Sequence, residues 1–225
     1  MFKSKITKEE LNDLPLVAFE GKIVLVETPE QVIEAAKALN ECKYLGVDTE
    51  TRPSFTRGIR YKISLLQLSN LETCYLFRIN KIGLPTSIAD ILANKNIQKI
   101  GLALKDDFAG LNKVTRFKPN NFVDLQAIAK DYGILELGLQ KIFAIVFGSK
   151  ISKAQQLSNW ESIQLTEQQK RYAATDAWAS LLIYIQLLHE EKISKKELDK
   201  LVAEAMDAQI KHQQDLARLR IVTQQ

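Results

Sequence analysis

The order of apolar and helical segments restricts the folds open to this 225-residue chain. Four apolar runs of strand length come first, interrupted by one helical segment: 23–27, 44–47, 63–68 and 74–79, with the helix at about 28–40. Beyond residue 80 helical segments predominate, with short strands between them: helices at about 85–93, after 107, 124–132, 138–147 and 167–189, and strands at 97–104 and 121–123. Successive strands followed by alternating helices are typical of a mixed sheet flanked by helices. We therefore predict an α/β fold.

The ends of the predicted helices carry recognisable caps. Thr28 precedes Pro29, and threonine is a common N-cap while proline fits the first helical position. Gly133 and Gly148 follow helical segments, where glycine readily adopts the left-handed backbone that closes a helix. Asp124 begins the 124–132 helix, so we interpret it as an N-cap rather than as a catalytic acid.

An Asp-x-Glu pair, Asp48 and Glu50, directly follows the apolar run 44–47. Side chains two residues apart on a strand point to the same face, so both carboxylates can face one metal site. Most such pairs are surface charges. Two acids at the end of a buried strand are less common, because burying an unpaired charge is costly. The pair is therefore a candidate metal site.

Two neighbouring acids, Asp106 and Asp107, follow the apolar run 100–104 and precede a segment that could open a helix. One of them could cap that helix, since aspartate is a favoured N-cap residue. Both roles are compatible if Asp106 lies near the cap and Asp107 faces the metal site. The local pattern does not choose between these interpretations.

Tyr172 and Asp176 lie four residues apart in a strongly predicted helix. Thr166 and Gln169 fit the Thr-x-x-Gln capping box, and neither Gly nor Pro occurs from there to about residue 189. Residues i and i+4 share a helix face, so the phenol and the carboxylate project to the same side. An isolated tyrosine in such a helix is usually a core residue, but its spacing from Asp176 favours a functional role.

Four carboxylates from three segments of the chain thus become candidate metal ligands: Asp48, Glu50, Asp107 and Asp176. Hydrolysis of a phosphodiester by two divalent ions about 3.5–4 Å apart needs acidic oxygens from several segments. Hard cations such as Mg²⁺ prefer oxygen ligands to sulfur or imidazole, and the chain has only two histidines. The pattern predicts a site for two divalent ions, Mg²⁺ or Mn²⁺.

Three segments together resemble the DEDD family of 3′-to-5′ exonucleases, in its tyrosine-containing subclass. The third motif is the longest match, QQLSNWESIQLTEQQKRYAATDAWASLLIYIQL at 155–187. VDTET with ISLLQLS at 63–69 resembles the first motif, and KIGLALKDDFAGL resembles the second. The resemblance covers roughly residues 20–190. Within this family the second motif favours the Werner-like branch, because ribonuclease D-like members often carry His or Asn where this chain has Ala103, Leu104 and Lys105.

The resemblance implies an RNase H-like fold and a 3′-to-5′ exonuclease that uses two metal ions. Its register places the second-motif acid at Asp107, with Leu111 four residues later. The four carboxylates would ligate the ions. Tyr172 would orient the attacking water, since a phenol with a pKa of about 10 is a poor base at neutral pH. Two alternatives are a degenerate module that binds nucleic acid without cutting it and a ribonuclease D-like enzyme for RNA 3′ ends. A degenerate copy would usually have lost at least one ligand.

Candidate substrate-binding residues flank these motifs: Thr49, Gln67, Lys105, Lys153, Asn159, Trp160 and Arg171. The segment 149–160 lacks a clear period and is predicted to be a loop, and loops on rigid scaffolds often carry binding residues. Trp160 could stack on a base, although packing in the core is the commoner role for such a residue.

Basic residues gather in two clusters that could contact phosphates. They are Lys95, Lys99, Lys105, Lys113, Arg116 and Lys118, and then Arg52, Arg57, Arg60 and Lys62. A solvated basic face is the alternative for any single lysine. We expect the partner to be nucleic acid with a free 3′ end, either DNA or RNA.

Bulk properties agree with a soluble enzyme. The net charge is +4, and the hydrophobic content of 46% is ordinary for a globular protein. Cys42 and Cys74 fit neither a disulfide framework nor a thiolate metal site, which suggests a reducing compartment. The first residues lack an apolar signal core, and no stretch reaches transmembrane length. We therefore expect a cytoplasmic protein with no membrane partner.

The last part of the chain differs from the rest. Acidic and basic residues balance after residue 193, and apolar residues such as Leu198, Leu201 and Val202 recur at helical spacing. We predict an exonuclease domain at 1–192 and a C-terminal helical tail at 193–225. The tail could pack on the domain or mediate self-association.

Overall fold

The computed structural model describes residues 1–56, 58 and 61–222. Within these residues six strands form one mixed sheet in the order β1-β4-β3-β2-β5-β6. The strands are β1 Lys22–Val26, β2 Tyr44–Thr51, β3 Ile63–Ser69, β4 Thr73–Phe77, β5 Gln98–Gly101 and β6 Phe122–Asp124. β3 runs antiparallel to β2 and β4, and the other pairs are parallel. The predicted mixed sheet is confirmed.

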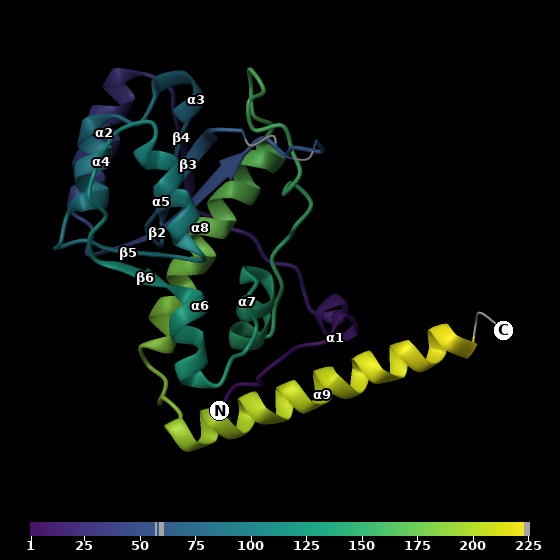
Figure 1. Cartoon of the computed structure of the whole chain (residues 1–225). Coiled ribbons are helices and arrows are strands. Elements are labelled where there is room, and N and C mark those ends of the chain that lie inside the picture. The colour runs from purple at the N-terminus through teal and green to yellow at the C-terminus, as the bar shows by residue number, and fades with distance from the viewer. Residues whose placement is uncertain (57, 59–60, 223–225) are drawn as a thin grey trace.

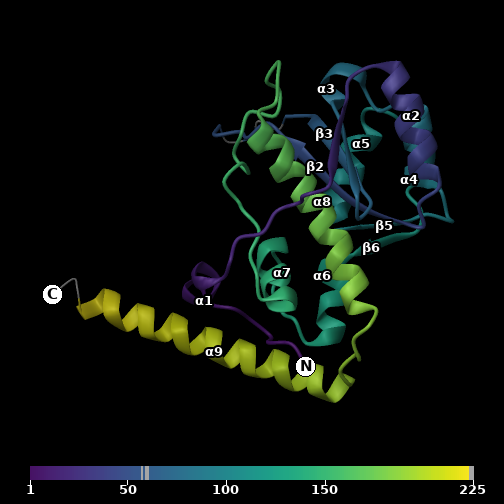
Figure 2. The same cartoon turned by 180° about the vertical axis from the view of Figure 1, so that it is seen from behind.

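Helices cover both faces of the sheet (Figure 1). α2 (Pro29–Asn40), α4 (Thr86–Ala93) and α5 (Leu104–Asn112) share one hydrophobic core with the sheet. α7 (Leu139–Phe147) and α8 (Glu167–Leu187) bury apolar side chains against the other face. Viewed from behind, α8 crosses the sheet on the side away from α2 and α4 (Figure 2). The remaining helices are α1 Lys8–Asp13, α3 Ile79–Ile82, α6 Leu125–Ile128 with a 3₁₀ turn at Ala129–Tyr132, and α9 Lys195–Val222.

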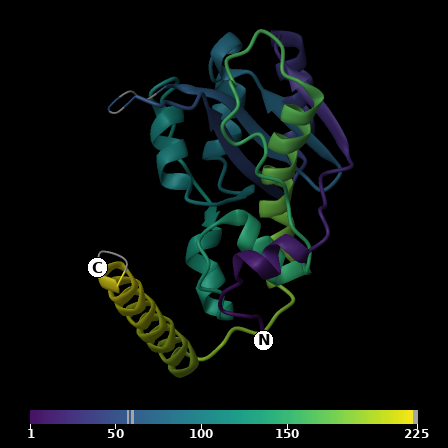
Figure 3. The same ribbon diagram turned by 90° about the vertical axis from the view of Figure 1, so that its right-hand side faces the viewer.

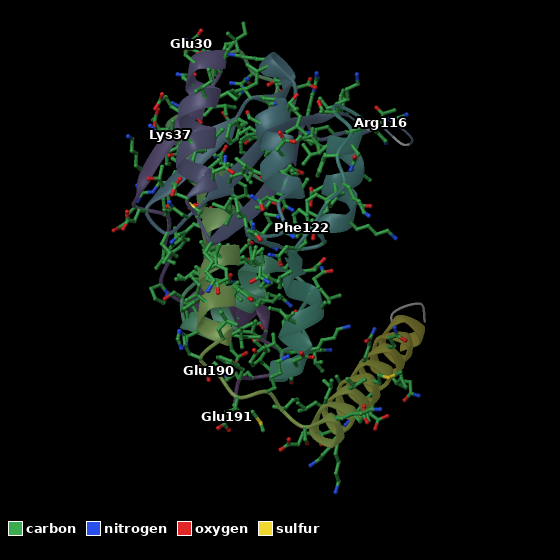
Figure 4. The ribbon with its side chains drawn as sticks, turned by 90° about the vertical axis from the view of Figure 1, so that its left-hand side faces the viewer. Glu30, Lys37, Arg116, Phe122, Glu190 and Glu191 are labelled. Carbon is green, nitrogen blue, oxygen red and sulfur yellow. The ribbon has the colours of Figure 1, made fainter. Side chains whose placement is uncertain are left out.

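The predicted caps occur where the sequence placed them. Thr28 accepts from the backbone N–H of Gln31, and Pro29 is the first residue of α2. Gly133 and Gly148 close their helices with φ of 79° and 62°, the left-handed region that glycine tolerates best. On α2 the charges follow the helix dipole, with Glu30 in the first turn and Lys37 in the last, and both side chains point outward (Figure 4).

The start of α5 differs from the prediction. The strand expected at 97–104 ends at Gly101, and the helix begins at Leu104, before Asp106 and Asp107 rather than after them. Ala103 turns the chain with φ of 56°. The backbone N–H groups of Ala103 and Leu104 donate to the Asp124 carboxylate at 3.1 and 3.2 Å. The Asp124 carboxylate therefore accepts hydrogen bonds from the backbone at the start of α5 and also caps α6. Asp106 is not the cap of α5.

Further differences concern the ends of elements and one helix that was not predicted. The strand expected at 74–79 ends at Phe77, because Arg78 begins the turn into α3. The 124–132 helix has a 3₁₀ second half. The sequence analysis missed α1, although Thr7 and Glu10 form a capping box at its start.

A close approach of α8 to β2 sets the geometry of the site. A Cβ atom on Gly46 would lie 1.9 Å from the backbone oxygen of Ala177, so only glycine fits beneath the helix. Ala173, Ala174 and Ala177 are fully buried in the same layer. Small side chains on both elements let the backbones meet, and this contact brings the acids of β2 to those of α8.

The predicted C-terminal helical extension is present as α9. It projects away from the rest of the molecule (Figure 3). Its beginning lies near the 3₁₀ turn, where a Cβ on Gly133 would be 3.3 Å from Leu201 Cδ1. The domain boundary at 192/193 stays a prediction. Among the described residues, no helix combines the length and apolar character needed to cross a bilayer.

Candidate active site

Asp48 and Glu50 occupy the face of β2 that looks toward α8. Leu45 and Val47 point to the opposite face and pack in the core with α2 and α4. Strand alternation then turns Asp48 and Glu50 to α8, where they meet Asp176. One carboxylate oxygen from each of these three residues lies within 4.8 Å of the other two. Sequence-distant acids thus converge as predicted.

Asp176 and Tyr172 project from α8 one turn apart. The helix begins at the predicted capping box, in which Gln169 N–H donates to Thr166 Oγ1 at 3.2 Å and Thr166 N–H donates to Gln169 Oε1 at 3.0 Å. Asp176 is 8% exposed and Tyr172 is 9% exposed. The Tyr172 ring packs against Trp160, with ring centroids 6.0 Å apart. Tyr172 therefore packs in the core and also borders the acids.

Asp107 comes from the first turn of α5, a helix that packs on the sheet face opposite to α8, and burial raises its pKa. It accepts a hydrogen bond from the Thr49 hydroxyl, and it is not in the group of acids that converge within 4.8 Å. Its negative charge still raises the pKa of Asp48. Three of the four predicted metal ligands are thus adjacent, while the fourth is close enough to contribute charge but is held by Thr49.

The acids repel one another in a poorly solvated place. Burial first, and then the charges of Asp176 and Asp107, raise the pKa of Asp48 well above its usual value. Burial first, and then the charges of Asp48, Asp176 and Asp107, raise the pKa of Glu50 to about 10. Burial raises the pKa of Asp176 to about 7, although the Tyr172 phenol and the Lys153 ammonium lower it. The crowded oxygens fit a hard divalent cation, whose charge would offset this repulsion.

The Tyr172 phenol is held in its neutral form. Burial raises its pKa, and the charges of Asp176 and Glu50 raise it further. At neutral pH the group is therefore a hydrogen-bond donor and not a free base.

A pocket of about 270 Å³ opens over these residues. Its wall combines Asp48, Glu50, Tyr172 and Asp176 with residues of α7 and of the loop before α8: Leu139, Gln140, Ile151, Ser152, Lys153 and Gln156. Lys153 was predicted to contact substrate, and the structure places it in this wall. Gln140, Gln156 and Ser180, which also lines the pocket, were missed, because no motif marks them.

Thr49, also predicted to contact substrate, lines this same pocket. The remaining predicted substrate-binding residues lie in different places. Lys105, Asn159 and Arg171 are exposed. Arg171 lines a separate pocket of about 990 Å³, which shares Ser152 and Tyr172 with the first. Gln67 and Trp160 are both 0% exposed, which contradicts their assignment to substrate binding. For Trp160 the packing alternative holds.

The basic clusters need a correction too. Lys99 is fully buried, and its ammonium donates to the backbone oxygens of Asn94 and Ile97 at 2.6 and 2.7 Å, so it adds nothing to a basic surface. Arg116 of the same cluster lies at the surface after α5 (Figure 4). Arg57 and Arg60 lie outside the described residues. Arg52 forms an ion pair with Glu161 at 3.4 Å, which links the segment after β2 to the loop before α8.

Comparison with known proteins identifies similar sequences and folds. A family model described as 3′-5′ exonuclease matches residues 23–192. The mouse protein "Bifunctional 3'-5' exonuclease/ATP-dependent helicase WRN" is 32% identical over 196 residues, covering 82% of this chain and 14% of the mouse protein. An Arabidopsis thaliana 3'-5' exonuclease is 27% identical over 188 residues, covering 76% of this chain and 65% of that protein. The chain thus spans less than two thirds of either relative.

A solved structure shares the fold. Escherichia coli RNase D, described as an exoribonuclease involved in structured RNA processing, superposes with a TM-score of 0.67 at 24% identity. The match covers 76% of this chain and 44% of the RNase D chain.

Proposed function

Since the chain belongs to the 3′-5′ exonuclease family, as its motifs predicted, we propose that it hydrolyses nucleic acid stepwise from the 3′ end with two divalent ions, Mg²⁺ or Mn²⁺. The observation that carries the proposal is the convergence of Asp48, Glu50 and Asp176 within 4.8 Å beside Tyr172. A degenerate binding module would have no need of this cluster of mutually repelling carboxylates.

The carboxylates would hold the cations. Asp48, Glu50 and Asp176 supply the adjacent oxygens, and Asp107 supplies a fourth carboxylate from the first turn of α5. Bound divalent cations neutralise phosphate charge and acidify a coordinated water. The protein's own contribution is to hold these acids in place: they project from a strand and a helix, and the close contact of β2 with α8 at Gly46 fixes the distance between the two elements.

Tyr172 would orient the attacking water. Its neutral phenol can donate a hydrogen bond, and it lies in the same pocket wall as the acids. Lys153, an exposed cation in that wall, would contact the phosphate of the terminal nucleotide. Lys105, Asn159 and Arg171 remain proposed substrate contacts farther from the acids.

The substrate class is open between DNA and RNA, because discrimination depends on contacts to the 2′-hydroxyl. Degradation of 5′-labelled single-stranded DNA, recessed duplex and RNA of one sequence tests the whole proposal. We expect ladders that shorten from the 3′ end with Mg²⁺ or Mn²⁺ and stop with excess EDTA. Activity that persists in EDTA, or loss of the 5′ label as mononucleotide, would contradict it.

We also propose that α9 mediates self-association. Val202, Met206 and Ile210 recur every four residues on this projecting helix and are 37%, 60% and 51% exposed. Analytical ultracentrifugation of the wild type and of Met206→Glu tests this. Loss of a concentration-dependent dimer in the variant supports the proposal, and a wild type that is monomeric at all concentrations contradicts it.

A further inference from the structure

Gln67 is buried without a hydrogen-bond partner. It lies in the middle of β3 with 0% exposure. Among the described residues, the buried side-chain nitrogen and oxygen atoms without a partner are Gln67 Nε2, Gln67 Oε1 and Trp160 Nε1. Another buried glutamine, Gln169, shows the usual arrangement, because it bonds to Thr166 and Asn159. An unpaired buried amide destabilises a fold, so its presence calls for a role.

The sheet register places this amide beside a predicted metal ligand. Gln67 is the direct partner of Asp48 in the antiparallel pair β2–β3. Directly opposed residues carry side chains on the same face, with Cβ atoms about 4.5–5.5 Å apart. Asp48 faces the metal site, so the Gln67 side chain lies next to the Asp48 side chain on that face of the sheet.

Most other neighbours on that face are apolar or already hydrogen-bonded. Leu76 is opposite Gln67 on β4, and Leu65 lies two residues away on β3. Ser69, two residues away in the other direction, already donates its hydroxyl to the Asn70 backbone oxygen at 2.8 Å. Above the sheet, α8 contributes the apolar residues Ala173 and Ala177 to the same core. Two carboxylates remain on this face: Asp48 is directly opposite Gln67, whereas Glu50 is opposite Leu65 and therefore only diagonal to Gln67. The Asp48 carboxylate is thus the nearest acceptor in the register.

We propose that Gln67 is a positioning residue whose amide donates to the Asp48 carboxylate when the site holds its cations. The inference rests on the proposed metal site. A ligating carboxylate is commonly oriented by a hydrogen bond from a residue outside the ligand set, and losing that partner weakens metal binding. In this role Gln67 never touches substrate, which agrees with its complete burial.

The proposal predicts that one substitution changes stability and metal affinity in opposite directions. Gln67→Met keeps the length of the side chain and removes both unpaired atoms. The metal-free variant should therefore melt higher than the wild type, by about 2–4 °C, because an unsatisfied buried amide has been removed. Its affinity for Mn²⁺ should fall by about 10–100-fold, because Asp48 has lost its partner. A residue that only filled space would not produce these opposite changes.

The experiment uses the full chain without nucleic acid. Isothermal titration with Mn²⁺ gives the affinity, and melting in EDTA gives metal-free stability, for wild type, Gln67→Met and two comparison variants. Ser69→Ala changes a buried polar residue on the same face and should leave Mn²⁺ affinity unchanged. Gln67→Asn keeps an amide but shortens it by one methylene, so Mn²⁺ affinity should fall without a rise in melting temperature.

Each result is decisive. Unchanged Mn²⁺ affinity in both Gln67 variants overturns the proposal, and so does an equal loss in Ser69→Ala. If Gln67→Met does not fold, Gln67→Asn alone decides through its Mn²⁺ affinity. Failure of the proposed function would show separately, as a wild type that binds Mn²⁺ but shortens no nucleic acid.

Discussion

Acids reach the site from both faces of the sheet, and they differ in how far the protein itself satisfies them. On the α5 face, Asp107 accepts a hydrogen bond from Thr49, which offsets part of the burial that raises its pKa. On the α8 face, Asp48, Glu50 and Asp176 crowd together. Burial raises the pKa of all three, and repulsion among the acids raises the pKa of Asp48 and Glu50 further. The α5 face is therefore the better satisfied of the two, whereas the α8 face depends more on an external cation. Function is therefore expected to depend most on the face that is least stable by itself.

Asp176→Asn should produce the largest change and sharpens this contrast. The substitution removes a charge from the α8 face, so cation binding and turnover should nearly disappear. The metal-free protein should melt at a higher temperature, because a repelled buried carboxylate has been neutralised. Single-turnover cleavage and a melting curve in EDTA measure the two effects. A variant that lost activity through unfolding would instead melt lower.

Asp107→Ala tests whether the α5 face belongs to the catalytic site. We expect most turnover to be lost, since the motif register and the influence of Asp107 on the Asp48 pKa both place it in the acid set. Asp106→Ala is the matched control. Asp106 is exposed in the first turn of α5 and is not its cap, so its loss should cost at most about 1 kcal/mol of stability and little rate. Reversed behaviour would show that the register is wrong.

Tyr172→Phe should have an intermediate effect. It deletes one hydroxyl but keeps the ring that packs on Trp160. If the phenol positions the water, single-turnover cleavage should slow by about 10²–10⁴-fold while Mn²⁺ affinity stays near wild type. A folded variant with undiminished cleavage would return Tyr172 to a purely structural role and leave the carboxylates as the whole catalytic set.

The pH dependence of stability should be the smallest effect. Asp176 has a pKa of about 7 in the folded chain, above the ordinary aspartate value of 3.8 expected when unfolded, so the folded state binds more protons between these values. Its stabilising contribution is complete below about pH 4 and is lost as pH rises through 7. Melting in EDTA from pH 5 to 8 should show falling stability. Asp176→Asn should make the decline less steep without removing it, because the pKa values of Asp48 and Glu50 are raised as well, and a wild type that gains stability over this range would refute the assignment.

Local sequence determined the elements and most of their ends. The Thr28 and Thr166 caps and the glycines after the helices depend on neighbours in the chain, and all lie where predicted. Asp48 and Glu50 share one strand face as predicted, but they lie within β2, which continues to Thr51, rather than after its end. The i, i+4 spacing also placed Tyr172 and Asp176 on one side of α8. These features are local because hydrogen bonding within a turn and alternation along a strand need only a few residues.

Tertiary structure decided what the pattern left open. The cap at α5 comes from Asp124, some twenty residues away, and so could not be seen around Asp106 and Asp107. Gln67 and Trp160 resembled substrate contacts, but packing beneath α8 buries both completely. The convergence of Asp48 and Glu50 with Asp176 depends on the close contact at Gly46. The sequence thus determined which groups are available, while the long-range packing of α8 on β2 decided which of them meet, because burial and pKa depend on neighbours that are remote in the chain.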